Sequence, residues 1–152
     1  MNFKIHRTIL FLCILPGSLF SESLLAAQYW GITDNKLPYI AKVRAQAGGH
    51  IVVYNPDTCD EIGVACGFFV EHASAHAHLN HRLMPPEAYT TMSEDQADCW
   101  VAKNGKPEEV YAAVQLLLDD NRIPDINIIG DPALRAEKIR ACAEQAGNWY
   151  PE

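Results

Sequence analysis

Basic residues are scarce in this sequence, which has 12 Lys and Arg against 19 Asp and Glu and a formal net charge of −7. An acidic chain without a basic stripe repels phosphate groups, which excludes nucleic acid and anionic membranes as expected partners. The sequence also lacks internal repeats, low-complexity segments and any linker long enough to separate two domains. These absences predict one domain with a modest hydrophobic core.

No apolar run is long enough to span a membrane, although a short one lies near the N-terminus. Lys4 and Arg7 precede this run, residues 8–20, and small residues follow it. That order is typical of a secretory signal peptide. We therefore expect residues 1–27 to be removed and residues 28–152 to form a single domain, periplasmic or secreted, that does not contact the membrane. The alternative is an N-terminal anchor or a buried first helix.

The sequence has no CxxC pair, which is the commonest cysteine spacing of zinc sites. Cys13 lies inside the expected signal peptide, and the remaining four cysteines are Cys59, Cys66, Cys99 and Cys142. An even number in an exported domain predicts two disulfides, with three pairings open. We favour Cys59–Cys66, which closes a small loop, and Cys99–Cys142, which would tie two helices together. A site that binds metal through thiolates is the alternative.

Alternation and turn residues predict a β-hairpin early in the domain. Apolar and polar residues partly alternate over residues 39–46, and residues 50–54 are apolar and mostly β-branched. Gly48 and Gly49 separate the two runs, as in many hairpins.

Helical signals follow the hairpin. They are apolar residues at helical spacing, a capping box that begins at Ser93, Pro107 at a first helical position, and Asp131-Pro132 before a helix that Gly147 closes. They predict four helices, over residues 65–82, 93–104, 107–118 and 133–146. A hairpin followed by four helices belongs to the α+β class.

Four histidines gather in the segment HASAHAHLNH, residues 72–81. His72 and His76 are one helical turn apart, so both imidazoles project from one face and can bind one zinc ion. The HxxxH pattern alone is weak, since two histidines can also be satisfied by hydrogen bonds on a packed face.

A second segment strengthens the prediction of a metal site. Glu94 begins the expected helix 93–104, and Asp98 lies one turn further on the same face. Glu94 would complete a three-ligand site with an open fourth position, and Asp98 would accept the free N–H of a ligating histidine. The alternatives are that Glu94 only favours the helix dipole and that Asp98 is a solvated surface acid.

These residues resemble the gluzincin metallopeptidases, particularly the small exported minigluzincins. HASAH and EDQADCW resemble the family's HExxH and ExxADCW, VVYNP (52–56) resembles the edge strand before the metal helix, and GDPALRAEKIRAC (130–142) resembles its C-terminal segment. The resemblance covers residues 50–142 in the family's order. It implies a small zincin-like metallopeptidase domain, one zinc ion bound by His72, His76 and Glu94, and Asp98 hydrogen-bonded to a ligating histidine.

The chain departs from the family where catalysis is carried out. Ala73 stands at the position of the HExxH glutamate, which takes a proton from the zinc-bound water. Position 75, where the inverted HxxEH motif holds its base, is also alanine, and Glu71 is expected to point away from the metal as a surface residue. Asp131 replaces a histidine of the family. No catalytic residue is therefore predicted.

His78 and His81 project away from the midline between His72 and His76 on an unbroken helix. We therefore expect both to be solvent-exposed, without a place in the metal site. A minor surface ion site of His78 and Glu71 is the alternative.

Three functions are compatible with these observations. The first is an exported zinc-binding pseudoenzyme that acts by binding a peptide or protein ligand. The second is a weakly active zinc hydrolase with a base from elsewhere, such as Glu87. The third is a disulfide-stabilised interaction domain without a metal.

Overall fold

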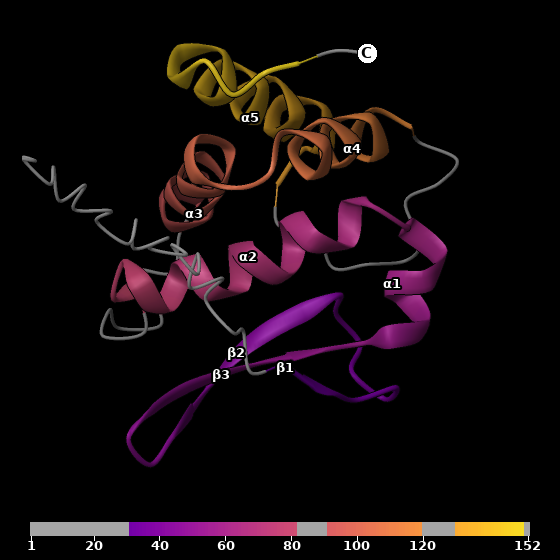
Figure 1. The fold of residues 1–152 in the computed structure, drawn as a ribbon, viewed down its shortest axis with the longest axis vertical. Coiled ribbons are helices and arrows are strands. Elements are labelled where there is room, and N and C mark those ends of the chain that lie inside the picture. Colours follow the sequence, from indigo (N-terminus) through magenta and orange to yellow (C-terminus); the bar gives the residue numbers. More distant parts are fainter. Residues whose placement is uncertain (1–30, 82–90, 120–129, 151–152) are drawn as a thin grey trace, which may run out of the picture.

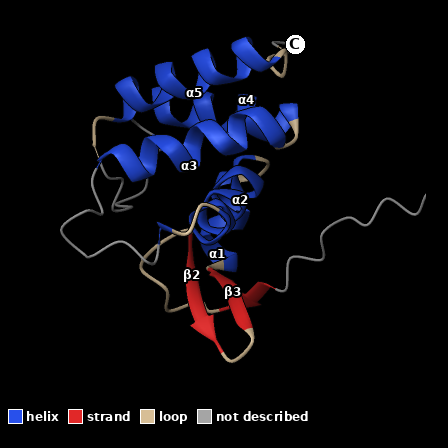
Figure 2. Cartoon of the chain, turned by 90° about the vertical axis from the view of Figure 1, so that its left-hand side faces the viewer, coloured by secondary structure: helices blue, strands red, loops and turns tan. Residues whose placement is uncertain are grey.

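A computed structural model describes residues 31–81, 91–119 and 130–150 of the chain. In Figures 1 and 2 the helix of residues 65–78 packs across a small sheet, and the helices of residues 91–104, 107–118 and 132–146 lie on the other side of it. The elements in chain order are β1 (Gly31–Thr33), β2 (Ala41–Gln46), β3 (Gly49–Tyr54), α1 (Pro56–Ile62), α2 (Ala65–His78), α3 (Thr91–Asn104), α4 (Pro107–Leu118) and α5 (Pro132–Ala146). The expected α+β class is confirmed.

The hairpin of β2 and β3 is confirmed, but β3 is not an edge strand. The two strands pair antiparallel, and Gly48 in the turn has a φ of 86°, which favours glycine. The short strand β1 pairs parallel with β3, so the order of the sheet is β1-β3-β2. The three exposed residues of β1 carry too little periodicity to predict a strand. Without β1, the segment VVYNP was wrongly expected at an edge of the sheet, whereas β3 lies in its middle.

Helix α1 is an addition to the four predicted helices. The Asn55 side chain accepts hydrogen bonds from the backbone N–H groups of Asp57 and Thr58, and Pro56 occupies the first helical position. The Asn-Pro pair is itself a signal for a helix start. It ends β3 and begins α1 at the same point.

Helix α2 ends earlier than the predicted residue 82. Asn80 has a φ of 58°, and the N–H of Leu79 donates to the carbonyl of Ala75 at 2.8 Å. Asparagine tolerates the left-handed conformation that commonly follows a helix. The chain therefore turns at residue 80, which moves His81 off the helical path.

The remaining helices agree with the prediction apart from one start. Helix α3 begins at Thr91, so Ser93 lies within the helix and is not its N-cap. Pro107 opens α4 as predicted. The Asp131 side chain accepts from the N–H groups of two residues in the first turn of α5, and Gly147 closes that helix with a φ of 70°.

Both predicted disulfides are confirmed. Cys59–Cys66 joins α1 to α2, and Cys99–Cys142 joins α3 to α5. Such bonds are typical of proteins in an oxidising compartment. Helix α2 packs between the sheet and the other helices, and its Phe68 is fully buried in the core. Within the described residues, no helix has the length and apolar character needed to cross a membrane.

Candidate metal centre

His72 and His76 meet at one point on the buried face of α2. One helical turn separates them in the sequence, so their rings project in the same direction. Their Nε2 atoms lie 2.9 Å apart, with ring centroids 4.7 Å apart. Both side chains are buried. The two nitrogens predicted as ligands are therefore adjacent and shielded from water.

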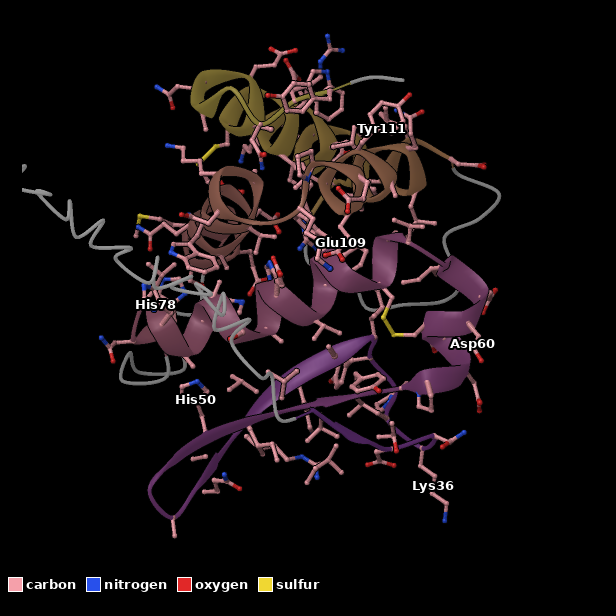
Figure 3. All side chains as sticks on the ribbon, in the orientation of Figure 1. Lys36, His50, Asp60, His78, Glu109 and Tyr111 are labelled. Carbon is pink, nitrogen blue, oxygen red and sulfur yellow. A yellow bond between two sulfur atoms is a disulfide. The ribbon has the colours of Figure 1, made fainter. Side chains whose placement is uncertain are left out.

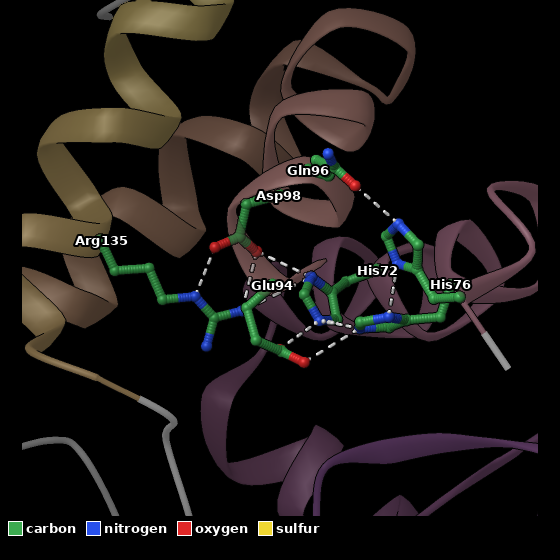
Figure 4. A network of polar contacts seen from close by, with 7 residues as sticks. His72, His76, Glu94, Gln96, Asp98 and Arg135 are labelled. Atoms are coloured by element: carbon green, nitrogen blue, oxygen red, sulfur yellow. Dashed lines mark hydrogen bonds and ion pairs between the residues drawn. The ribbon is translucent and has the colours of Figure 1, made fainter. Parts of the chain in front are cut away.

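Glu94 brings a carboxylate from α3 to the same point (Figure 4). Its Oε2 lies 3.1 Å from Nε2 of His72, and its Oε1 lies 3.4 Å from Nε2 of His76. A tetrahedral ion with bonds of about 2.0–2.1 Å separates its ligand atoms by about 3.3 Å. The observed separations are close to that value. His72, His76 and Glu94 form a group that could hold a metal ion.

Asp98 lies behind His72, one turn after Glu94 on α3. Its Oδ1 is 2.7 Å from Nδ1 of His72, on the side of the ring opposite the ligand nitrogen. Asp98 is only 2% exposed, so its charge needs a buried partner. Arg135 of α5 supplies it, donating from Nε and from a terminal nitrogen to the two carboxylate oxygens at 2.5 and 2.7 Å. The pair fixes the orientation of the His72 ring.

Arg135 had no predicted place in the site. The resemblance covered it only as part of a C-terminal segment, and its spacing of 37 residues from Asp98 gives no hint of contact. The available signal was chemical, because a buried acid in a dry site requires a cation or several N–H groups.

His81 is the clearest error of the sequence analysis. It is not solvent-exposed but 3% exposed, and its Nδ1 lies 3.0 Å from Nδ1 of His76. Its Nε2 lies 3.0 Å from Oε1 of Gln96 on α3. The left-handed residue Asn80 causes this placement, because it turns the chain back toward the His76 ring. His78 is exposed as expected, and its ring packs 5.0 Å from Trp100.

The charges of the site compensate one another. Burial by itself raises the pKa of Glu94, but the hydrogen bonds to His72 and His76 and the charges of the two rings together lower it well below its usual value, so the carboxylate stays ionised. Burial also raises the pKa of Asp98, and the hydrogen bonds from Arg135 and His72 reverse that effect. Burial lowers the pKa of His72, yet its bonds to Asp98 and Glu94 raise it overall. The metal-free site therefore favours a proton on His72 beside two carboxylates.

Burial is the main cause that lowers the pKa of His81; the hydrogen bond to Gln96 opposes it, and the neighbouring His76 adds a smaller lowering effect. His81 is therefore neutral near pH 7, with one ring nitrogen that donates and one that accepts.

The two positions at which related zinc motifs carry a base, 73 and 75, are both occupied by buried alanines. Ala73 is 3% exposed, and Ala75 belongs to the hydrophobic core. Glu71 is half-buried and not a plain surface residue as expected. Its carboxylate lies against Gly105, close to Glu109, which Figure 3 shows between α4 and α2. Glu87 falls outside the described residues.

No protein-family model, no curated protein and no solved structure matches this chain. The function is therefore inferred from the contacts of the chain's own residues.

Proposed function

We propose that this protein is an exported zinc-binding domain of the gluzincin type that acts by binding and does not hydrolyse peptides. The observation that carries the proposal is the convergence of His72, His76 and Glu94 beside two alanines at the base positions. The three side chains can bind a metal ion, and the two alanines cannot take a proton from a bound water.

Zinc is favoured by the chemistry of the three ligand atoms. Two imidazole nitrogens and one carboxylate are the ligands of open zinc sites, whereas magnesium and calcium prefer oxygen atoms alone. Two ligands come from α2 and one from α3, so an ion would join these helices and add to folding stability. A bound zinc ion would act as a Lewis acid toward an oxygen atom at its open position.

A general base is lacking among the described residues near the site. Glu94 is assigned to the metal, Asp98 is paired with Arg135, and Asp95 is paired with Lys138 at 2.6 Å. The carboxylate of Glu71 lies against Gly105. Because zinc-dependent hydrolysis requires a group that takes the proton of the attacking water, the site favours retention of a ligand over its cleavage.

The open coordination position suits a carboxylate or a peptide carbonyl, so the expected ligand is a peptide or protein. The net charge of −7 argues against nucleic acid as that ligand. The two disulfides support a periplasmic or secreted location, where such a domain would meet exported or extracellular peptides.

Metal content tests the proposal most directly. Elemental analysis of the purified protein is expected to find one zinc per chain, and none in a His72→Ala/His76→Ala double variant. The absence of zinc from the wild-type protein, even after loading with zinc, would remove the metal site and leave a disulfide-stabilised interaction domain.

Restoring the base tests the lost activity. Ala73→Glu is expected to produce zinc-dependent hydrolysis of a generic peptide mixture, whereas the isosteric Ala73→Gln is not. Position 73 is where the resemblance places the family's glutamate, and Ala73, although buried, does not belong to the core cluster that contains Ala75. Zinc-dependent hydrolysis by the wild-type protein would instead establish an active hydrolase.

A further inference from the structure

His81 and Gln96 lie behind His76 much as Asp98 lies behind His72. The Nδ1 atoms of His76 and His81 are 3.0 Å apart, and Nε2 of His81 is 3.0 Å from Oε1 of Gln96. The rings of His76 and His81 pack at 5.1 Å between centroids. The second nitrogen of each candidate histidine ligand thus has its own partner.

Hydrogen-bond roles determine where the protons of this chain of contacts lie. If Nε2 of His76 offers its lone pair to an ion, its proton must be on Nδ1, which then donates to Nδ1 of His81. Because Nδ1 of His81 then accepts, the proton of His81 is on Nε2, which donates to Oε1 of Gln96. An amide oxygen only accepts, so Gln96 completes the chain. One arrangement of protons satisfies every contact.

We propose that His81 and Gln96 are positioning residues of the metal site, which hold His76 as the Nδ1–H tautomer with Nε2 directed at the ion. The inference rests on the proposed zinc binding. Neither residue contacts the ion. His81 acts through the ring of His76, and Gln96 acts through the ring of His81.

The fold makes this arrangement specific. Asn80 places His81 over the end of α2, and α3 presents Glu94 to the ion, Gln96 to His81 and Asp98 to His72. His81 is buried whereas Gln96 is exposed, so water can replace the Gln96 amide more easily than it can replace the His81 ring. We therefore expect the larger effect from changes at His81.

Zinc affinity, measured on the full chain by competition with a chromophoric chelator, tests the proposal. His81→Leu should weaken zinc binding about 10–100-fold, the usual effect of losing such a partner. His81→Asn should recover most of the affinity, because its amide oxygen can accept from Nδ1 of His76. Gln96→Glu should bind zinc more tightly than wild type, because a charged acceptor strengthens the hydrogen bonds that run from His76 through His81 to residue 96. Gln96→Leu, which has no acceptor, should bind zinc less tightly.

A purely structural role predicts a different pattern, in which His81→Asn is as impaired as His81→Leu and Gln96→Glu brings no gain. Either result would overturn the proposal, as would equal affinity of wild type and His81→Leu. Failure of wild type itself to bind zinc would refute the proposed function, which is a separate outcome.

The ring protons provide a second readout. Nitrogen-15 NMR of the zinc-loaded protein should find the proton of His76 on Nδ1 and that of His81 on Nε2. A proton on Nδ1 of His81 would contradict the assigned chain of hydrogen bonds even if zinc binds.

Discussion

Helix α2 carries acidic neighbours on two sides, and they behave in opposite ways. On the side of α3 and α5, Glu94 and Asp98 are buried; His72 and His76 lower the pKa of Glu94, and Arg135 and His72 lower that of Asp98. On the side of α4, burial and then the charge of Glu109 raise the pKa of Glu71. Both sides contain two carboxylates, but only the first also contains buried bases.

The difference shows that burial alone does not decide whether a carboxylate is ionised. Burial opposes ionisation on both sides, and the partners decide the outcome. Near Glu71 and Glu109 the cation is Lys106, whose Nζ lies 2.6 Å from Glu109 in an exposed position. Solvent weakens the Lys106–Glu109 pair, so Lys106 does not offset the repulsion between Glu71 and Glu109. Arg135, by contrast, is buried with Asp98 and keeps that carboxylate ionised.

The largest effect is expected from the Asp98–Arg135 pair. Asp98→Asn leaves a buried guanidinium without its counter-charge and should lower the free energy of unfolding by about 3–5 kcal/mol. The matched control is Asp95→Asn, whose partner Lys138 is 40% exposed and whose loss should cost under about 1 kcal/mol. Urea denaturation of the metal-free proteins measures both. Equal losses would mean that burial does not distinguish the two pairs.

The pH dependence of stability should reveal the charges of Glu94, Asp98 and His72. Because the pKa values of Glu94 and Asp98 are lowered on folding, they stabilise the metal-free protein above about pH 4, and this contribution is lost as the pH falls further. Because the pKa of His72 is raised, its contribution is complete below about pH 6.5 and declines as the pH rises, by at most about 1.4 kcal/mol per unit.

Zinc should invert the upper part of this profile. An ion bound at the proposed site would replace the proton on His72, so the increase in melting temperature on adding zinc should be larger at pH 8 than at pH 6. Differential scanning calorimetry at several pH values, with and without zinc, measures it. A shift independent of pH would indicate that zinc binds elsewhere.

Two neutralising substitutions should change stability in opposite directions. Glu94→Gln should lower the free energy of unfolding of the metal-free protein by about 1–2 kcal/mol at pH 7, because it loses charge-assisted hydrogen bonds to histidine. Glu71→Gln should raise it by a few tenths of a kcal/mol, since solvent screens the repulsion that it relieves. Thermal unfolding compares the two variants, and stabilisation by both would remove the contrast between the sides.

Small effects are also expected at two glycines near Glu71 and Glu109. A Cβ at Gly105 would lie 2.8 Å from the backbone carbonyl of Val101, so Gly105→Ala should cost about 1 kcal/mol. A Cβ at Gly67 meets only the flexible carboxylate end of Glu109, and alanine favours the helix, so Gly67→Ala should change stability by less than about 0.5 kcal/mol. Denaturant midpoints measured side by side test this order.

Local signals predicted much of the fold. Pro107 and the Asp131 cap mark helix starts that depend on a few adjacent residues, and the structure has both. The hairpin around Gly48 likewise follows from alternation and a turn. By contrast, β1 exists through its pairing with β3, which no local pattern of three exposed residues reveals.

The candidate site was predictable only where helical spacing determines direction. The spacing of His72 and His76 places both rings on one face, and that of Glu94 and Asp98 does the same on α3. His81 was misplaced because the prediction assumed an unbroken helix to residue 82, whereas the left-handed conformation of Asn80 ends the helix earlier.

The sequence by itself determined the ligand types, the paired histidines and the lack of an acid at positions 73 and 75, because these depend on residue identity and helical pitch. The tertiary structure decided which acids face the histidines, that Arg135 neutralises Asp98, and that His81 and Gln96 complete the contacts of His76. Those contacts join residues from different helices. Their geometry depends on how the helices pack, which spacing along one segment does not specify.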